Sequence, residues 1–434
     1  MKICVQGLWH LGSVTAACVA RAGFSTVGLD ADAEIIACLS SGQAPLYEPG
    51  LDDLIQAGSA AGLLAFTTDP ATVADADLVW VTFDTPVDDE DRADAAIVVS
   101  AVEQLFPLLK DGAVILISAQ VPVGTTRALA RAFADVAGGR RVGFAYSPEN
   151  LRLGKAIEVF EHPERIVVGT ADDHARAVLE PTLGRFCDRL IWVSIESAEL
   201  AKHSLNAFLA VSVTFMNEIA TLCEQVGADA AEVEQALRSE PRIGTRAYIR
   251  PGAGFAGGTL ARDIMTLNQL AALHDLDLPL LGGVMPSNKR HLNWPARQLA
   301  TRLGDLAGRR ICILGLTYKP GTDSLRRSPG IDLCRVLLAA GAAVTAHDPH
   351  AEPLPADLRA VTRSDTALGA LAGAEAAVLM TEWPDYRDLT TDAIAAAMAQ
   401  PLVLDQGRFL AAGLAGKAGL RYITLGTPLI TPQA

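Results

Sequence analysis

The chain begins Met1-Lys2-Ile3-Cys4-Val5-Gln6-Gly7-Leu8-Trp9-His10-Leu11-Gly12, and this stretch decides the fold. The apolar run before Gly7 predicts a buried strand, and the two glycines predict a tight turn into a helix. A turn of this kind resembles the G-x-G-x-x-G pattern, which places a pyrophosphate on a helix N-terminus. Trp9 stands where that pattern has its middle glycine, so a turn without a ligand stays open on this motif alone.

The same alternation of strand and helix continues beyond this turn, which predicts a doubly wound sheet of parallel strands. In the first part of the chain we expect strands at Lys2–Gln6, Ser25–Leu29, Leu78–Thr82, Val114–Ser118, Val142–Tyr146, Ile166–Gly169 and Leu190–Val193. A second set is expected at Arg310–Leu314, Ala343–Ala346, Ala376–Met380 and Pro401–Leu404.

Between the two sets, Ser197–Gln225 repeats apolar side chains at helical spacing, and Gly227 lies just past its end. We therefore expect an α/β protein with two Rossmann-like doubly wound parallel-sheet domains joined by a long central helix. The expected domains are residues 1–195, 196–305 and 306–434. The apolar stripe of the helix is longer than one domain needs to cover, which predicts a homodimer through this helix.

Composition narrows the class of protein. The 434 residues carry a formal net charge of −14, which disfavours nucleic acid and anionic lipid as partners. The longest apolar runs, such as Leu278–Met285, are far shorter than a membrane span, and the N-terminus has no signal-peptide pattern. We therefore expect a cytoplasmic protein that binds neither membrane nor nucleic acid. Its seven cysteines show no metal-ligand spacing, so no metal is expected.

Asp30 ends the second expected strand. A carboxylate at this place can accept a hydrogen bond from a ribose 2′-hydroxyl and repels a 2′-phosphate. Asp30 therefore predicts NAD, rather than NADP, as the cofactor.

Further motifs, in the same order along the chain, resemble the UDP-glucose/GDP-mannose dehydrogenase family. They are Tyr47–Leu51, Thr85-Pro86, Val121–Thr125, Ser147–Arg152, Pro163–Gly169, Ala198–Lys202, Asn206–Ala210, Arg242–Gly244, Gly315–Pro320, Thr381–Trp383 and Gly407-Arg408. The resemblance implies an N-terminal domain that binds NAD, a C-terminal domain that binds the nucleotide of a sugar donor, and a central helix that forms a dimer. It also implies oxidation of a hexose C6 alcohol, through an aldehyde, to a carboxylate with two NAD.

The resemblance assigns roles to individual residues. The expected cofactor-binding residues are Gly7, Trp9, His10, Leu11, Gly12, Asp30, Thr85, Pro86, Gln120 and Arg326. The expected substrate-binding residues are Glu149, Leu151, Arg152, Lys202, Asn206, Arg242, Tyr248, Gly252, Phe255, Gly257, Lys319 and Arg408. Among these, Lys319 and Arg408, together with Arg326, are the cations expected near the diphosphate or the sugar, and Arg242 is expected to reach the sugar from the neighbouring subunit.

The expected catalytic residues are Lys202, Asn206, Asp263, Glu149, Thr259 and Gln120. Lys202 and Asn206 are four residues apart, so they share one helix face and can both donate to a developing oxyanion. Glu149 is a candidate general base or orienting group. Asp263 follows a glycine-rich loop, Pro251–Gly258, whose backbone N–H groups can wrap a sugar diphosphate. Each has a simpler alternative: a surface lysine, an acid at a helix start or a surface loop.

The chain departs from the family where the chemistry is expected. The family loop PGxGFGGSCFPKD is PGAGFAGGTLARD here, so Thr259 stands at the nucleophilic cysteine. A threonine hydroxyl is far less acidic than a thiol, and the motif offers no adjacent base. Gln120 also replaces a threonine, Leu153 a glutamate and Arg262 a lysine.

Three functions therefore remain open at the level of sequence. The first is oxidation of UDP-glucose to UDP-glucuronate. The second is the same chemistry that stops at the aldehyde or uses another sugar, such as a UDP-N-acetylhexosamine or GDP-mannose. The third is a catalytically inactive nucleotide-sugar binder, against which the retained Lys202, Asn206, Glu149 and Asp263 argue.

We predict that the protein turns over NAD faster than NADP, because the Asp30 carboxylate repels a 2′-phosphate. Asp30→Ala should narrow the difference between the two cofactors. Initial rates with each cofactor at equal concentration measure this preference. Equal or faster turnover of NADP by the unaltered protein would show that Asp30 does not select the cofactor.

Overall fold

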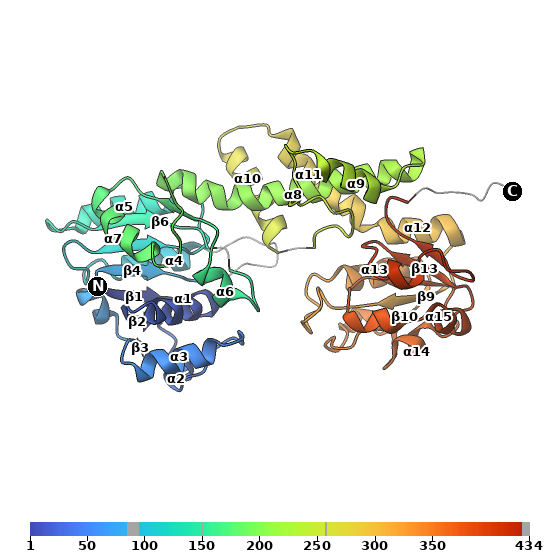
Figure 1. Cartoon of the computed structure of the whole chain (residues 1–434), viewed down its shortest axis with the longest axis horizontal. Helices are drawn as coiled ribbons and strands as arrows, with labels where there is room; N and C mark the ends of the chain where they lie inside the picture. The colour runs from blue at the N-terminus through green and yellow to red at the C-terminus, as the bar shows by residue number, and fades with distance from the viewer. Residues whose placement is uncertain (85–94, 150, 257, 428–434) are drawn as a thin grey trace. The chain divides into compact units, whose positions relative to one another are not determined.

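The computed structural model describes residues 1–84, 95–149, 151–256 and 258–427 (Figure 1). The chain divides into two compact units, Met1–Leu205 and Asn206–Ala434, and each is described by itself. Three of the expected binding residues, Thr85, Pro86 and Gly257, lie outside the described residues.

The first unit is built on one sheet in the order β3-β2-β1-β4-β5-β6-β7-β8. All neighbouring strands are parallel except β6 and β7, which run antiparallel. The sheet is therefore the expected doubly wound sheet of parallel strands apart from this one pair. The expected strands also omit β3. The bounds are β1 Lys2–Gln6, β2 Ser25–Leu29, β3 Leu64–Thr67, β4 Leu78–Val81, β5 Val114–Ile117, β6 Gly143–Tyr146, β7 Ile166–Gly169 and β8 Leu190–Val193.

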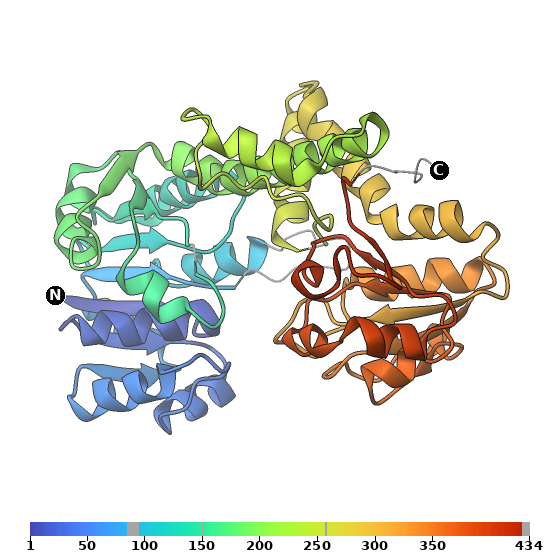
Figure 2. The same cartoon turned by 45° about the vertical axis from the view of Figure 1, so that its right-hand side comes forward.

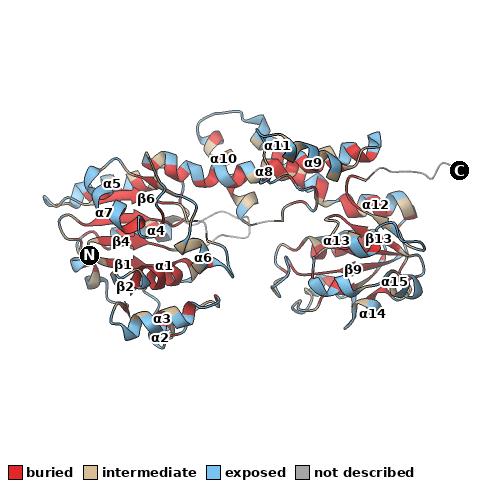
Figure 3. Cartoon of the chain, viewed as in Figure 1, coloured by how far each residue is buried: buried red, intermediate tan, exposed pale blue. Residues whose placement is uncertain are grey.

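Both faces of this sheet are covered by helices, which explains why its central strands are apolar throughout. On β1, Ile3 and Val5 pack on one face and Cys4 packs on the other. The face with Ile3 carries α1 (His10–Arg21), α3 (Leu51–Ala60), α6 (Ala156–Glu161) and α7 (Asp173–Leu183). The opposite face carries α4 (Ala95–Glu103), α5 (Thr125–Val136) and the 3-10 helix Pro70–Asp75. The short α2 (Ala33–Ser40) is capped by the preceding Asp32, whose side chain accepts hydrogen bonds from Glu34 N and Ile35 N. Figure 3 shows the resulting buried strands β1 and β4.

The central helix is confirmed as α8, which runs from Ile195 to Val226 without a break. By length and composition alone, α8 could cross a lipid bilayer. Its buried polar side chains instead bond to the rest of the protein: Glu199 to the start of α5, and Glu224 to Trp294 and Gln298. We therefore assign α8 as a core helix. The apolar runs of the sequence did not mark α8 as a possible membrane span, because polar residues interrupt the apolar residues of this helix.

In its described residues, the second unit contains the rest of α8, four helices before a second sheet, and four more helices that accompany this sheet (Figures 1 and 2). The first four helices are α9 (Ala230–Ser239), α10 (Thr259–Leu273), α11 (Pro279–Leu292) and α12 (Trp294–Leu303). The sheet has the order β11-β10-β9-β12-β13-β14 and is parallel throughout. Its strands are β9 Arg310–Leu314, β10 Ala343–His347, β11 Thr362–Arg363, β12 Ala376–Leu379, β13 Leu402–Asp405 and β14 Arg421–Ile423. The expected strands omit the two edge strands, β11 and β14. The helices that accompany the second sheet are α13 Pro329–Ala339, α14 Ala367–Leu371, α15 Thr391–Ala397 and α16 Ala411–Leu414, and 3-10 turns lie at Ala356–Leu358 and Pro384–Asp388.

The two sheets share one type of turn, which follows β1 in the first sheet and β9 in the second. Gly7 follows β1 and Gly315 follows β9, and both have positive φ, +88° and +94°. In each case an aspartate at the end of the neighbouring strand accepts the next N–H: Asp30 from Leu8 (2.6 Å) and Asp348 from Leu316 (2.7 Å). The same turn therefore begins both domains.

Asp348 differs from Asp30 because its carboxylate is fully engaged inside the protein. It is buried and accepts six hydrogen bonds, from Leu316 N, Thr317 N, Thr317 Oγ1, Trp383 Nε1, His350 N and Ala351 N. Burial raises the pKa of this carboxyl, but the hydrogen bonds outweigh burial and hold the pKa below its usual range. Asp348 thus serves the structure and leaves no oxygen for a ribose.

We predict that Asp348→Ala lowers the free energy of unfolding by about 3 kcal/mol or more, because several buried donors lose their acceptor. Since the folded pKa is lowered, the carboxylate stabilises the protein at neutral pH and this contribution is lost as the pH falls. Denaturant unfolding at pH 7 and at acid pH measures both effects. The exposed Asp332→Ala is the control, expected to change stability by less than about 0.5 kcal/mol. Equal effects of the two substitutions would contradict this account.

Candidate active site

The glycine-rich turn after β1 has the tight shape that the pyrophosphate pattern requires. A side chain at Gly12 would place its Cβ 1.7 Å from the carbonyl oxygen of Gly7, so only glycine fits there. The turn leads directly into α1, whose first N–H groups have no partners within the helix. Trp9 immediately precedes α1, and its side chain is 44% exposed, so the indole extends toward solvent. The turn therefore keeps the form of a pyrophosphate site although its middle glycine is absent.

Glu48 connects this turn to a second loop, a role that the sequence motif did not reveal. Its buried carboxylate accepts hydrogen bonds from His10 Nε2 (3.0 Å), Gly154 N (2.8 Å) and Ala156 N (2.8 Å). Burial raises the pKa of Glu48, but these hydrogen bonds outweigh burial and hold the pKa below its usual range. One carboxylate thus ties the first residue of α1 to the loop that follows Glu149.

Lys202 and Glu149, both expected in the site, form a direct ion pair. The Lys202 ammonium donates to Glu149 Oε1 (3.0 Å) and to the Glu149 carbonyl oxygen (2.6 Å). Lys202 is 8% exposed, so it is not a solvated surface lysine. The second carboxylate oxygen of Glu149 accepts from Leu151 N (2.8 Å), which fixes the direction of the carboxylate. A buried ammonium in this position is a strong donor to any oxyanion beside it.

One turn before Lys202 on α8, Glu199 is fully buried. Its carboxylate accepts from Gly124 N (2.6 Å) and Thr126 N (2.9 Å) at the start of α5. These two bonds fasten the loop after β5 to α8. The half-buried Gln120 lies in the same loop.

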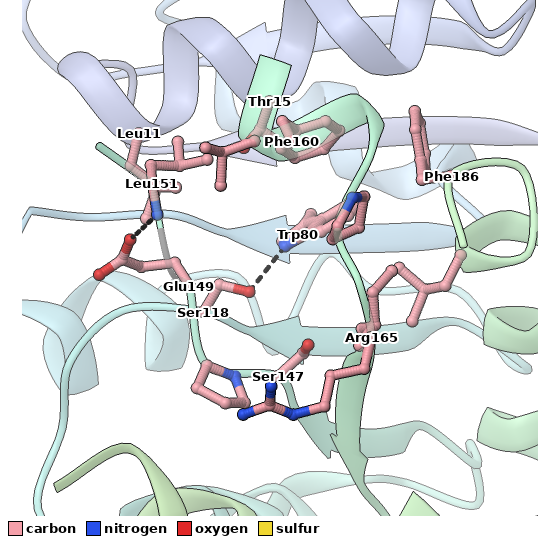
Figure 4. A pocket seen from close by; sticks show the side chains of 15 residues that line it. Leu11, Thr15, Trp80, Ser118, Ser147, Glu149, Leu151, Phe160, Arg165 and Phe186 are labelled. Carbon is pink, nitrogen blue, oxygen red and sulfur yellow. Dashed lines mark hydrogen bonds between the residues drawn. The ribbon is translucent and has the colours of Figure 1, made fainter. Parts of the chain in front are cut away.

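A small pocket in the first unit brings expected cofactor and substrate residues together (Figure 4). Leu11 lines it from α1, and Glu149 and Leu151 line it from the loop after β6. Its volume is about 90 Å³, and most of its wall is apolar. Trp80 forms part of the wall and donates from its indole to Ser118 Oγ (2.9 Å). The ionisable Glu149 is therefore placed at the edge of a largely apolar pocket.

The second unit carries the other expected catalytic residues. Asn206 Nδ2 donates to Asp263 Oδ2 at 2.5 Å, and both side chains are buried. Thr259 is the exposed first residue of α10 and follows Gly258, which has a φ of +93°. In the described part of the chain, no carboxylate, imidazole or amine is hydrogen-bonded to the Thr259 hydroxyl. Thr259 thus lies at a helix N-terminus without a base to activate it.

The remaining expected residues are dispersed. Arg408 is paired with Asp229 (2.5 Å), so part of its charge is already balanced. Arg242 is 88% exposed and paired with Glu240. Lys319, Arg152, Tyr248 and Arg326 are also exposed, whereas Phe255 packs against the cluster that contains Ala207 and Ile264. The structure therefore brings together the Lys202–Glu149 and Asn206–Asp263 pairs, whereas the expected cations Lys319 and Arg326 are exposed and Arg408 is paired with Asp229.

Three models of one protein family match this chain in sequence. The NAD binding domain of the UDP-glucose/GDP-mannose dehydrogenase family matches residues 1–184, its central domain residues 196–290, and its UDP binding domain residues 312–412. The UDP-glucose 6-dehydrogenase of Rhizobium meliloti is 35% identical and aligns with 99% of this chain and 100% of its own length. That of Pseudomonas aeruginosa is 33% identical, over 99% and 98%.

Solved structures give the same result. A UDP-glucose dehydrogenase from Pyrobaculum islandicum superposes with a TM-score of 0.81 and 30% identity, covering 94% of this chain and 95% of that one. A UDP-D-ManNAc dehydrogenase from Pyrococcus horikoshii has a TM-score of 0.83 at 24% identity, covering 98% and 99%, which shows a shared fold.

Proposed function

This chain belongs to the UDP-glucose/GDP-mannose dehydrogenase family, and on that premise we propose that it oxidises UDP-glucose to UDP-glucuronate with two NAD. The buried Lys202–Glu149 pair carries the proposal, because a desolvated ammonium beside a carboxylate supplies both an oxyanion donor and a base. Asn206, one turn further along α8, adds a second donor on the same helix face.

The residues of the first unit fit NAD. The N-terminus of α1 would hold the pyrophosphate, and Asp30, which still has accepting capacity on a partly exposed carboxylate, would hold the adenosine ribose. Bound NAD supplies the hydride acceptor in both oxidations. Leu11 at the pocket edge would shield the reacting carbon from water.

In the first oxidation, the C6 hydroxyl would lose its proton to the Glu149 carboxylate, and carbon C6 would give up a hydride to the bound cofactor. Lys202 and Asn206 donate hydrogen bonds to the oxygen while its negative charge develops. The products of this step are the C6 aldehyde, one reduced cofactor and one proton.

In the second oxidation, we propose that water adds to the aldehyde carbon and forms a geminal diol. Removal of a hydride and a proton from this diol gives the carboxylic acid, so no covalent bond to the protein is needed. Asp263, held by Asn206, positions the water, and the N-terminus of α10 at Thr259 favours the developing negative charge. The missing cysteine removes the thioester route without removing the groups that stabilise an oxyanion.

A substrate panel tests the proposal. Purified protein is incubated with NAD and, separately, with UDP-glucose, a UDP-N-acetylhexosamine and GDP-mannose, and products are identified by mass spectrometry. The highest kcat/KM is expected with UDP-glucose. A higher value with another sugar would reassign the substrate, and no turnover of any would leave a nucleotide-sugar binder.

The proposal includes a homodimer through α8. Phe208, Phe215 and Leu222 recur at a spacing of seven residues, and their side chains are 70%, 49% and 56% exposed. Large apolar side chains in a continuous stripe favour burial against a second copy. Arg242 would then be available to the site of the partner.

We predict that Lys202→Ala lowers kcat/KM about a hundredfold or more, because it removes a buried oxyanion donor. The NAD affinity should stay the same, since Lys202 contacts Glu149 and not the glycine-rich turn. Steady-state kinetics and cofactor titration measure the two effects. The exposed Lys155→Ala serves as control. Retained activity in Lys202→Ala would remove Lys202 from the mechanism.

We predict that Thr259→Ala changes the rate of acid formation by less than about threefold, because no base activates this hydroxyl. Thr259→Cys should increase the yield of acid over aldehyde or form an adduct visible by intact mass. Product analysis of both variants decides between water and threonine as nucleophile. An ester intermediate at Thr259 in the unaltered protein would overturn the water route.

We predict that Phe215→Asp converts the dimer to a monomer, because it places a charge in the apolar stripe. Sedimentation velocity at micromolar concentration measures the change. Leu273→Asp is the matched control, since Leu273 is 80% exposed but lies on α10, outside the stripe. An unaltered protein that sediments as a fully active monomer would refute the dimer.

A further inference from the structure

In the glycine-rich loop Pro251–Gly258, buried side chains hold the backbone of the described residues at two points, Gly252 and Phe255. At Gly252, the N–H donates to Asn217 Oδ1 (3.0 Å), and the carbonyl oxygen accepts from His291 Nε2 (2.8 Å). Because a carbonyl can only accept, Nε2 of His291 must carry the proton. Asn217 and His291 are 2% and 6% exposed.

At Phe255, a single amide side chain holds both backbone groups. Asn288 Oδ1 accepts from Phe255 N (3.0 Å), and Asn288 Nδ2 donates to Phe255 O (2.7 Å). Gly254 immediately precedes Phe255, and a Cβ at Gly254 would lie 2.7 Å from Asn288 Oδ1. The absence of a side chain at residue 254 therefore allows the loop to approach the amide of Asn288 closely.

These three residues come from two helices, Asn217 from α8 and Asn288 and His291 from α11. The loop that they hold leads directly into a third helix, α10, which begins at Thr259 and carries Asp263. Glycine residues have a large conformational freedom that otherwise opposes a single loop conformation. Four hydrogen bonds from buried groups offset that freedom at Gly252 and Phe255.

We propose that Asn217, Asn288 and His291, here named the loop clamp, are positioning residues for the dehydrogenase reaction. By holding Gly252 and Phe255, the loop clamp sets the position of the first turn of α10 and of the nucleotide sugar that the loop contacts. The inference rests on the proposed function, because the loop is the expected sugar-diphosphate contact. The loop clamp acts through the loop and not on the reacting atoms.

Hydrogen–deuterium exchange of the full-length protein tests the loop clamp without any substrate. In Asn288→Ala, the Phe255 amide should exchange about tenfold faster or more, because its acceptor is gone. Asn268→Ala is the matched control. The side chain of Asn268 on α10 also donates to a backbone oxygen, that of Leu281 on α11, and no described hydrogen bond joins it to the loop. The control should leave exchange of the loop unchanged.

Kinetics then test whether the loop position matters for the reaction. Asn288→Ala should lower kcat about ten- to a hundredfold at saturating UDP-glucose, since a small misplacement of reacting groups has effects of this size. The KM for NAD should not change, and Asn268→Ala should match the unaltered protein. His291→Leu should behave like Asn288→Ala, whereas His291→Gln, which can still donate to Gly252 O, should retain most of the activity.

The proposed role of the loop clamp is wrong if Asn288→Ala leaves the hydrogen–deuterium exchange of the loop amides unchanged. It is also wrong if this exchange accelerates while kcat and the KM for UDP-glucose stay constant. Equal loss of activity in His291→Leu and His291→Gln would also overturn it, because the donor would then not be the relevant feature. An unaltered protein without turnover would overturn the proposed function, and the exchange rates would still decide whether the loop clamp holds the loop.

Discussion

The continuous hydrogen bonding of α8 is the constraint on which the site depends. In a helix of thirty-two residues, Glu199, Lys202 and Asn206 have fixed heights and directions. Glu199 binds the start of α5, Lys202 binds Glu149, and Asn206 binds Asp263. The same helix presents its apolar stripe for the proposed dimer, so assembly and chemistry share one element.

Buried carboxylates also fix the local structure away from this helix, in each of the two units. Burial alone would raise the pKa of Glu48 and Asp348 and favour their neutral forms, yet their pKa values are lowered because backbone and side-chain donors outweigh the loss of water. Each such carboxylate joins segments that are distant in sequence. The departures from the family pattern are at Thr259, Gln120 and Leu153, and none of these residues is hydrogen-bonded to the Glu48 or Asp348 carboxylate in the described part of the chain.

The features predicted best from sequence are those with strong local signals: the turn at Gly7 and Gly12, the aspartate after β2, and α8. The edge strands β11 and β14 were missed because they are only two and three residues long. The antiparallel β6–β7 pair was missed because apolar patterning does not reveal strand direction. Asn288 and His291 were missed because, in sequence, they resemble ordinary polar residues of a helix. Their role depends on a loop more than thirty residues away, and only tertiary structure brings the two together.

We propose that this protein completes both oxidations although Thr259 replaces the cysteine. The most direct measurement is the number of NADH molecules formed for each UDP-glucose consumed, with the sugar product identified in the same sample. The water route predicts two NADH and UDP-glucuronate, without accumulation of aldehyde. One NADH for each UDP-glucose, with the C6 aldehyde as the released product, would contradict it.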